Sequence, residues 1–245
     1  VFQKDVKFKD LRLAIVDEQH RFGVRQRLEL GKKGQSADVL VMTATPIPRS
    51  LALAQYGDMD VSVLDEKPAG RQPIKTALIS DERVSEVIAH LRDAIAKGRQ
   101  AYWVCPLVGE SEMSDLIAAE ERFKTLRALL GEDVIRLVHG QMPAAEKDAA
   151  MADFVVGRAQ VLVATTVIEV GVNVPKATIM VIERAESFGL AQLHQLRGRV
   201  GRGSEASTCL LMYKAPLSEN GQKRLTVLRE TNDGFKISET DLQMR

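Results

Sequence analysis

An α/β fold, with a parallel sheet covered by helices on both faces, is predicted by two features of the 245-residue sequence. First, short apolar runs alternate with segments of helical periodicity, and repeated strand-helix units of this length build parallel sheets. Second, runs such as 101–107 and 161–164 are almost continuously apolar, which is typical of strands buried on both sides. The 45% hydrophobic content is sufficient to fill the cores of such a fold.

The elements at the start of the chain are a strand that begins at Leu13, a short helix over 22–34, a strand over 39–42 and a helix over 47–56. A stretch rich in Pro, Gly and charge follows and predicts a linker at 67–73, which divides a first domain (1–66) from a second one (74–214). The second domain is predicted to contain strands at 74–79, 101–107, 134–138, 161–164, 179–182 and 208–212, and helices at 84–96, 116–130, 144–155 and 190–196. Beyond it, residues 215–245 are predicted to form a helix over 219–230 and a second helix from Ser238.

Two carboxylates, Asp17 and Glu18, end the first strand, and ligands of open α/β sheets bind at that edge. An Asp there can hold Mg²⁺ through its water shell, while the neighbouring Glu, which faces another direction, can orient and deprotonate a water. The alternative is a strand that ends in two solvated acids. The second strand ends in Thr43-Ala44-Thr45-Pro46, where the hydroxyls could equally be turn caps.

Three arginines are interleaved with glycines in the segment 195–202, Gln-Leu-Arg-Gly-Arg-Val-Gly-Arg. Guanidinium groups stay charged and present a planar fork of donors, so two of them can clamp the oxygens of a transferring phosphoryl group. Taken alone, the segment could also be the solvated basic end of a helix.

Composition restricts the other possibilities. The net charge of +1 means that binding to nucleic acid would depend on local patches and not on a globally basic surface. Cys105 and Cys209, the only two cysteines, sit in apolar runs where a small core residue is expected, and they favour a reduced, cytoplasmic setting. No apolar run is long enough to span a bilayer, and no cluster of metal ligands is evident.

Four motifs, taken together, resemble the motor core of superfamily two helicases and translocases. They are Asp-Glu-x-His at 17–20, Thr-Ala-Thr-Pro at 43–46, a Thr165-Thr166 segment that runs to Gly171, and Gln-x-x-Gly-Arg-x-Gly-Arg at 195–202. The extended stretches 17–27, 43–49, 105–108, 165–175 and 188–199 resemble the RecG family of bacterial ATP-dependent DNA branch-migration translocases over essentially the whole chain. The fold that this resemblance implies is RecA-like.

The resemblance implies an enzyme that uses ATP and Mg²⁺. In the expected site Asp17 and Glu18 come from the first domain, while Arg199 and Arg202 reach across from the second with the support of Gln195. His20, Gly171 and Asn173 are expected on the nucleotide side. Many superfamily members have Asp at the position of Asn173, so a charge-dependent role there is in doubt.

The expected partner is branched or forked double-stranded DNA, held through its phosphates with little base reading. The positions that match are Arg49, His139, Gly140, Thr165 and Thr166, whereas Thr43 and Thr45 are expected to couple the ATP site to the DNA track. A packing or capping histidine is the alternative for His139. The resemblance suggests a monomer.

Two absences shape the remaining expectations. No Gly-x-x-x-x-Gly-Lys-Ser/Thr sequence occurs, so we expect the phosphate-binding loop to lie in a preceding half-domain and this piece to be inactive alone. The helical hairpin over 215–245 resembles a translocation element and is expected to be truncated.

Two alternatives remain for the function. One is an Mfd-type transcription-repair coupling translocase, which shares most of the motifs, and the other is a binding module that lost its activity. Intact Asp17, Glu18, Arg199 and Arg202 argue against the binding module.

Overall fold

The computed structural model describes residues 7–17, 37–43, 60–64, 66, 70–106, 112–165 and 174–244. The chain divides into two compact units, Val1–Ile47 and Pro48–Arg245. The predicted helices over 22–34 and 47–56 lie outside the described residues. The predicted linker at 67–73 falls within the second unit, and the domain limits derived from it stay a prediction.

The first unit contains two short parallel strands, β1 (Leu13–Val16) and β2 (Asp38–Val41), which pair in the register Ala14 to Val39 and Val16 to Val41. Ala14 and Val16 face a small buried cluster, whereas Leu13 and Ile15 on the other face are exposed. Because side chains alternate along a strand, this pattern assigns one face of the pair to a core. Both strands were predicted: β1 begins at Leu13 as expected and ends at Val16, before the two acids, and β2 lies one residue earlier than expected at each end.

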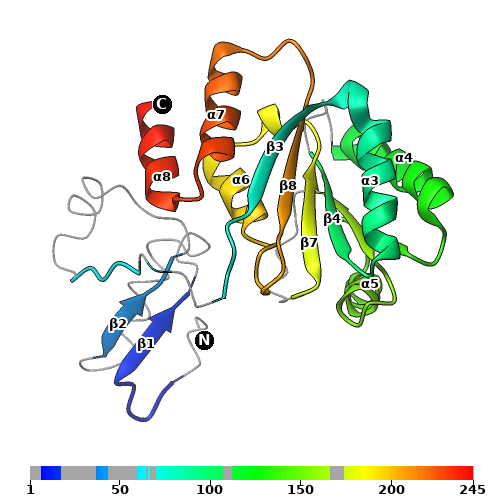
Figure 1. Ribbon diagram of the computed structural model, residues 1–245. Helices are drawn as coiled ribbons and strands as arrows, with labels where there is room; N and C mark the ends of the chain where they lie inside the picture. Colours follow the sequence, from blue (N-terminus) through cyan, green and yellow to red (C-terminus); the bar gives the residue numbers. More distant parts are fainter. Residues whose placement is uncertain are drawn as a thin grey trace. The chain divides into compact units, whose positions relative to one another are not determined.

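The second unit is built on a six-stranded, entirely parallel sheet with the order β3-β8-β7-β4-β6-β5 (Figure 1). The strands are β3 (Lys75–Ser80), β4 (Gln100–Cys105), β5 (Ile135–Val138), β6 (Val161–Thr165), β7 (Ala177–Ile182) and β8 (Thr208–Tyr213). The helices are α3 (Val84–Ala96), α4 (Glu112–Leu130), α5 (Ala144–Val155), α6 (Leu190–Arg197), α7 (Glu219–Glu230) and α8 (Gly234–Gln243). This confirms the predicted α/β class, with a helical hairpin after the last strand.

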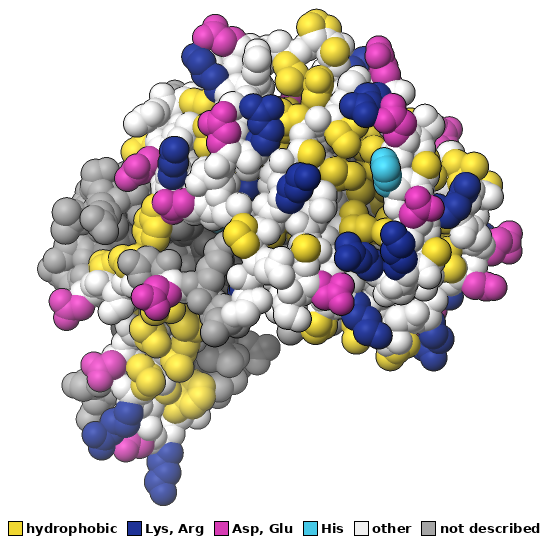
Figure 2. All heavy atoms as spheres, viewed as in Figure 1, with side chains coloured by type: hydrophobic (Ala, Val, Ile, Leu, Met, Phe, Trp, Pro, Cys, Tyr) yellow, Lys and Arg dark blue, Asp and Glu magenta, His cyan; other side chains and the backbone are white. Residues whose placement is uncertain are grey.

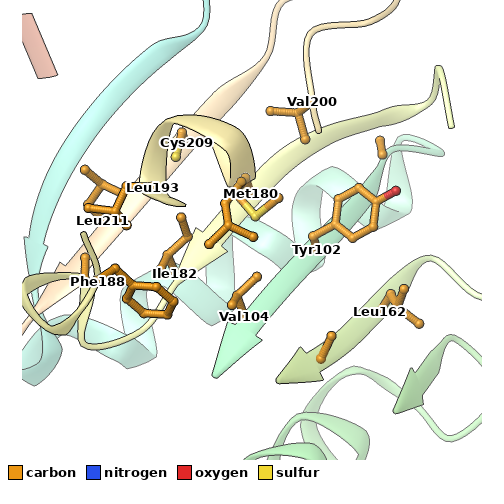
Figure 3. Packing of buried hydrophobic residues seen from close by; sticks show 14 of the residues in the cluster. Tyr102, Val104, Leu162, Met180, Ile182, Phe188, Leu193, Val200, Cys209 and Leu211 are labelled. Atoms are coloured by element: carbon orange, nitrogen blue, oxygen red, sulfur yellow. The ribbon is translucent and has the colours of Figure 1, made fainter. Parts of the chain in front are cut away.

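Helices cover both faces of this sheet, as Figure 1 shows for α6 and α7 on one side and α3 and α4 on the other. Alternate residues of β4 separate the two cores, because Tyr102 and Val104 pack with α5 to α8, whereas Trp103 packs with α3 and α4. Figure 3 shows the first of these cores, in which Tyr102, Val104 and Leu211 lie with Leu193 of α6. Each fully buried side chain of this size contributes about 1.5–3 kcal/mol.

Two helices begin earlier than the sequence predicts. Helix α4 starts at Glu112 and not at 116, and α8 starts at Gly234 and not at Ser238. In α8 the carboxylate Oδ1 of Asp233 accepts a hydrogen bond from the backbone N–H of Phe235 at 2.9 Å, so Asp233 caps the helix. No helix among the described residues is both long and apolar enough to cross a membrane.

Candidate functional site

The carboxyl-terminal edge of the large sheet brings together three of the predicted DNA contacts. Thr165 is the last residue of β6 and is buried, while His139 and Gly140 directly follow β5. Strands β5 and β6 are neighbours, and Val138 pairs with Ala164, so His139 lies level with Thr165. The ring Nδ1 of His139 is buried and has no hydrogen-bond partner among the described residues. These three residues therefore lie together at the carboxyl-terminal ends of two neighbouring strands.

The topological switch point of the sheet lies at the same edge, between β4 and β7. The chain leaves β4 for α4 on one face, and it leaves β7 for α6 on the other, and such a point is where open α/β sheets bind ligands. Glu183, the first residue after β7, accepts hydrogen bonds there from Trp103 Nε1 and from Arg122 Nε at 2.6 Å. The Arg122 guanidinium lies 5.8 Å from the centre of the Trp103 ring. This cluster was not predicted from the sequence, because its three residues are far apart in the chain.

A cavity of about 350 Å³ opens beside Glu183, and its lining residues are Asp81, Glu82, Arg122, Glu183, Arg184 and Met212. Burial opposes the charge on Arg122, but the hydrogen bond and the charge of Glu183 outweigh it, so the pKa of Arg122 is raised. Three carboxylates against two guanidiniums do not favour an anion such as a phosphate. The cluster therefore fixes α4 to the ends of β4 and β7.

The predicted catalytic arginines lie in the segment Gly198–Ser204, which we call the arginine loop. Helix α6 ends at Arg197, and Gly198 caps it. Arg199 and Arg202 are both half-buried, and Arg202 Nε donates a hydrogen bond to the Gly198 carbonyl oxygen at 3.3 Å. Gln195 is half-buried on the last turn of α6.

The arginine loop belongs to the amino-terminal edge of the sheet, opposite the edge that carries His139 and Thr165. A Cβ atom built on Gly203 would meet the carbonyl oxygen of Pro175, which precedes β7. The charges of Arg199 and Arg202 both act on the hydroxyl of Tyr102 near the start of β4, where burial raises the pKa of the phenol and the two arginines oppose that rise. The structure thus separates the predicted DNA contacts from the predicted catalytic arginines.

The third arginine of the motif, Arg197, is a different kind of residue. It is only 2% exposed, and its Nη1 donates to the carbonyl oxygens of Leu228 at 2.6 Å and Thr231 at 2.9 Å. Burial lowers the pKa of this guanidinium. Arg197 therefore ties α6, and with it the arginine loop, to the carboxyl-terminal end of α7.

In the first unit, Asp17 follows β1 and Thr43 lies two residues beyond β2. Both are exposed, and the backbone N–H of Met42 donates to the Val16 carbonyl oxygen at 2.8 Å, which aligns the two strand ends. A carboxylate oxygen is a ligand that Mg²⁺ prefers, so Asp17 fits the metal role predicted for it. The remaining predicted positions, Glu18, His20, Thr45, Arg49, Thr166, Gly171 and Asn173, lie outside the described residues.

Comparison with known proteins adds independent information. Residues 83–204 match the helicase conserved C-terminal domain. The ATP-dependent DNA helicase RecG of Pasteurella multocida is 58% identical, that of Escherichia coli 55% and that of Bacillus subtilis 51%; in each case the match covers 100% of this chain and 36% of the relative. The chain thus spans little more than a third of the length of these curated relatives.

Solved structures agree with the sequence matches. The structure of RecG bound to a three-way DNA junction superposes with a TM-score of 0.81 at 47% identity, over 100% of this chain and 31% of that one. The Mycobacterium smegmatis helicase Lhr, bound to single-stranded DNA and AMP-PNP, has a TM-score of 0.64 at 17% identity, which shows the shared fold. That match covers 94% of this chain and 31% of Lhr. The chain therefore belongs to the RecG family of DNA helicases, and its larger unit has the RecA-like fold of the helicase C-terminal domain.

Proposed function

We propose that this chain is part of the motor of an ATP-dependent translocase of double-stranded DNA, which remodels stalled replication forks and branch-migrates junctions. The observation that carries the proposal is the likeness to RecG over all 245 residues, at 50% identity or more in several relatives, with the arginine loop intact. The likeness to a RecG structure bound to a three-way DNA junction supports branched DNA as the partner.

The proposed chemistry divides the work among a few side chains. Glu18 orients and deprotonates the attacking water, and Arg199 and Arg202 stabilise the negative charge that spreads over the transferring phosphoryl oxygens. Gln195 supports the two arginines. Asp17 would hold Mg²⁺ through water, and the ion, when bound, supplies positive charge to the phosphate oxygens. His20, Gly171 and Asn173 complete the nucleotide side.

DNA is proposed to contact the carboxyl-terminal edge of the large sheet. The exposed Gly140 backbone, the His139 ring and the Thr165 hydroxyl are polar groups of the kind that hold phosphates without reading bases. Arg49 and Thr166 are proposed as further DNA contacts, and Thr43 and Thr45 as residues that couple DNA binding to ATP hydrolysis. Figure 2 shows positive and negative side chains interspersed on one face of the molecule, which fits contacts made by particular groups and not by a broad basic surface. We place the protein in the cytoplasm as a monomer.

The test is ATP hydrolysis by the full-length gene product, with any sequence that flanks these 245 residues, in the presence of a model fork or of linear duplex. We expect the fork to stimulate turnover more strongly than linear DNA of equal length. Glu18→Gln should lower kcat by at least about 100-fold, because it removes the general base but keeps the shape of the side chain. DNA affinity should stay unchanged.

The control is Arg127→Ala, which removes an arginine on α4 whose side chain is 45% exposed and paired with Glu132. It should hydrolyse ATP at the wild-type rate, since exposed ion pairs contribute roughly 0–1 kcal/mol. Absence of DNA-stimulated turnover in the wild type, or normal turnover in Glu18→Gln, would contradict the proposal and favour a module that only binds.

A further inference from the structure

The arginine loop rests on a residue far away in the sequence. Gly201 lies between Arg199 and Arg202 and adopts a φ of +73°, a left-handed conformation that L side chains rarely adopt. A Cβ atom built on Gly201 would lie 2.8 Å from Cγ1 and 3.1 Å from Cδ1 of Ile74. Real Cβ atoms do not approach other carbon atoms so closely. The backbone of the loop therefore sits directly on the Ile74 side chain, at a distance that leaves no room for a Cβ atom unless Ile74 or the loop moves.

Ile74 is itself fixed from several sides. It immediately precedes β3, and its side chain is half-buried against the core formed with α5 to α8. Its carbonyl oxygen accepts a hydrogen bond from Nδ2 of Asn232, in the turn between α7 and α8, at 3.2 Å. The next residue, Lys75, donates its N–H to the Ser207 carbonyl oxygen at 3.0 Å, so the support under the loop is continuous with the sheet.

A second contact joins the same segment to the other end of the arginine loop. Gln72 Nε2 donates a hydrogen bond to the carbonyl oxygen of Ser204 at 3.1 Å. Gln72 belongs to the stretch predicted as the linker between the motor domains. The segment Gln72–Ile74 thus contacts the arginine loop at its middle and at its end.

We propose that Ile74, with Gln72, positions Arg199 and Arg202 by supporting the backbone at Gly201, so that the segment entering β3 sets the placement of both guanidiniums. This inference rests on the proposed function, because it assigns Ile74 a role in ATP hydrolysis. The physical reason is geometric: a misplacement of about 1 Å in a catalytic group can cost roughly 100-fold in rate. Ile74 acts only through Gly201 and is a positioning residue.

The test is a pair of substitutions in the full-length gene product. Gly201→Ala should lower the kcat of fork-stimulated ATP hydrolysis by about 10- to 100-fold, because the new methyl group pushes the loop off Ile74. Ile74→Ala removes both atoms that the methyl group meets. Adding Ile74→Ala to Gly201→Ala should therefore restore kcat by at least about 5-fold, although the strained φ keeps the rescue incomplete.

The matched control is Leu78→Ala, which removes an aliphatic side chain of the same size from β3 and from the same core. Two unrelated core truncations add their damage, so Gly201→Ala with Leu78→Ala should be no more active than Gly201→Ala alone. Rescue by Ile74→Ala but not by Leu78→Ala supports the positioning role. Equal behaviour of the two double variants overturns it.

A third comparison applies if Gly201→Ala does not fold. Ile74→Ala and Leu78→Ala are then compared as single variants, with thermal unfolding as the measure of structural damage. Ile74→Ala should lower kcat several-fold more than Leu78→Ala, with the KM for ATP unchanged, because an interaction made in the transition state is lost. Equal kcat values overturn the inference, whereas a wild type without ATP hydrolysis overturns the proposed function itself.

Discussion

Single arginines within one motif have distinct environments, and the difference decides what each can do. Arg199 and Arg202 are half-buried in the arginine loop, whereas Arg197 is enclosed. The sequence shows three arginines within eight residues but does not reveal which one is buried. Burial of Arg197 depends on the position of the end of α7, which lies about thirty residues further along the chain. Arg197 uses its charge to hold backbone carbonyl oxygens, whereas the other two arginines remain partly exposed.

Replacement of Arg197 by Met tests its structural role. The change leaves the carbonyl oxygens of Leu228 and Thr231 without their donor, and each buried unsatisfied group costs about 1–3 kcal/mol. We expect the free energy of unfolding, measured with urea, to fall by about 2–4 kcal/mol. Arg127→Met, on the exposed surface of α4, should cost less than about 1 kcal/mol. Equal losses in the two variants would mean that Arg197 is not a structural anchor.

The two cysteines give a second residue-scale prediction. Burial raises the pKa of the Cys209 thiol to about 12, and it also raises the pKa of Cys105. Because only the thiolate reacts, neither cysteine should react with a thiol reagent at pH 8 in the folded protein, and both should react in urea. The stability should fall as the pH rises from about 8.5 towards 12, since the unfolded thiols ionise first. Rapid labelling of two thiols in the folded protein would contradict this.

The strands of the large sheet can be located from the sequence, because strands buried on both faces are long apolar runs. The long apolar runs of β4, β6, β7 and β8 predicted their positions to within two residues. Two further features were not predicted: the register shift between Gln100 and Ala101 of β4, and the contact of Gly201 with Ile74. Both depend on segments that are far apart in the chain, which local periodicity cannot relate. The glycines of the arginine loop were visible, but their neighbours were not.

The start of helix α8 is set by its capping residue, Asp233, and this can be tested by mutation. Its predicted start was wrong by four residues, because the Asp-Gly pair at its beginning is also typical of a turn. Asp233→Ala should lower the free energy of unfolding by about 1 kcal/mol, because Asp233 caps the first turn, whereas Asp233→Asn should cost much less. Urea denaturation measures both. The same loss in both variants would show that the cap contributes nothing specific.

At the scale of the larger unit, one sheet carries the two proposed sites at opposite edges. The proposed DNA contacts His139 and Thr165 lie at the carboxyl-terminal ends of the strands, and the arginine loop lies at the amino-terminal ends. Strands of five or six residues span roughly 17–20 Å, so the two edges are that far apart. The doubly covered sheet would therefore be the physical link between the DNA that the protein is proposed to bind and the arginines that are proposed to act on ATP.

The measurement that tests this account most directly is the kcat of fork-stimulated ATP hydrolysis by Arg202→Ala in the full-length gene product, alongside its affinity for the fork. Arginines that stabilise a transferring phosphoryl group contribute about 10³- to 10⁵-fold in rate. We predict a fall in kcat of about 1,000-fold or more with fork affinity unchanged, because Arg202 lies at the edge opposite the proposed DNA contacts. A kcat within about 10-fold of the wild type, or a loss confined to DNA affinity, would contradict the account.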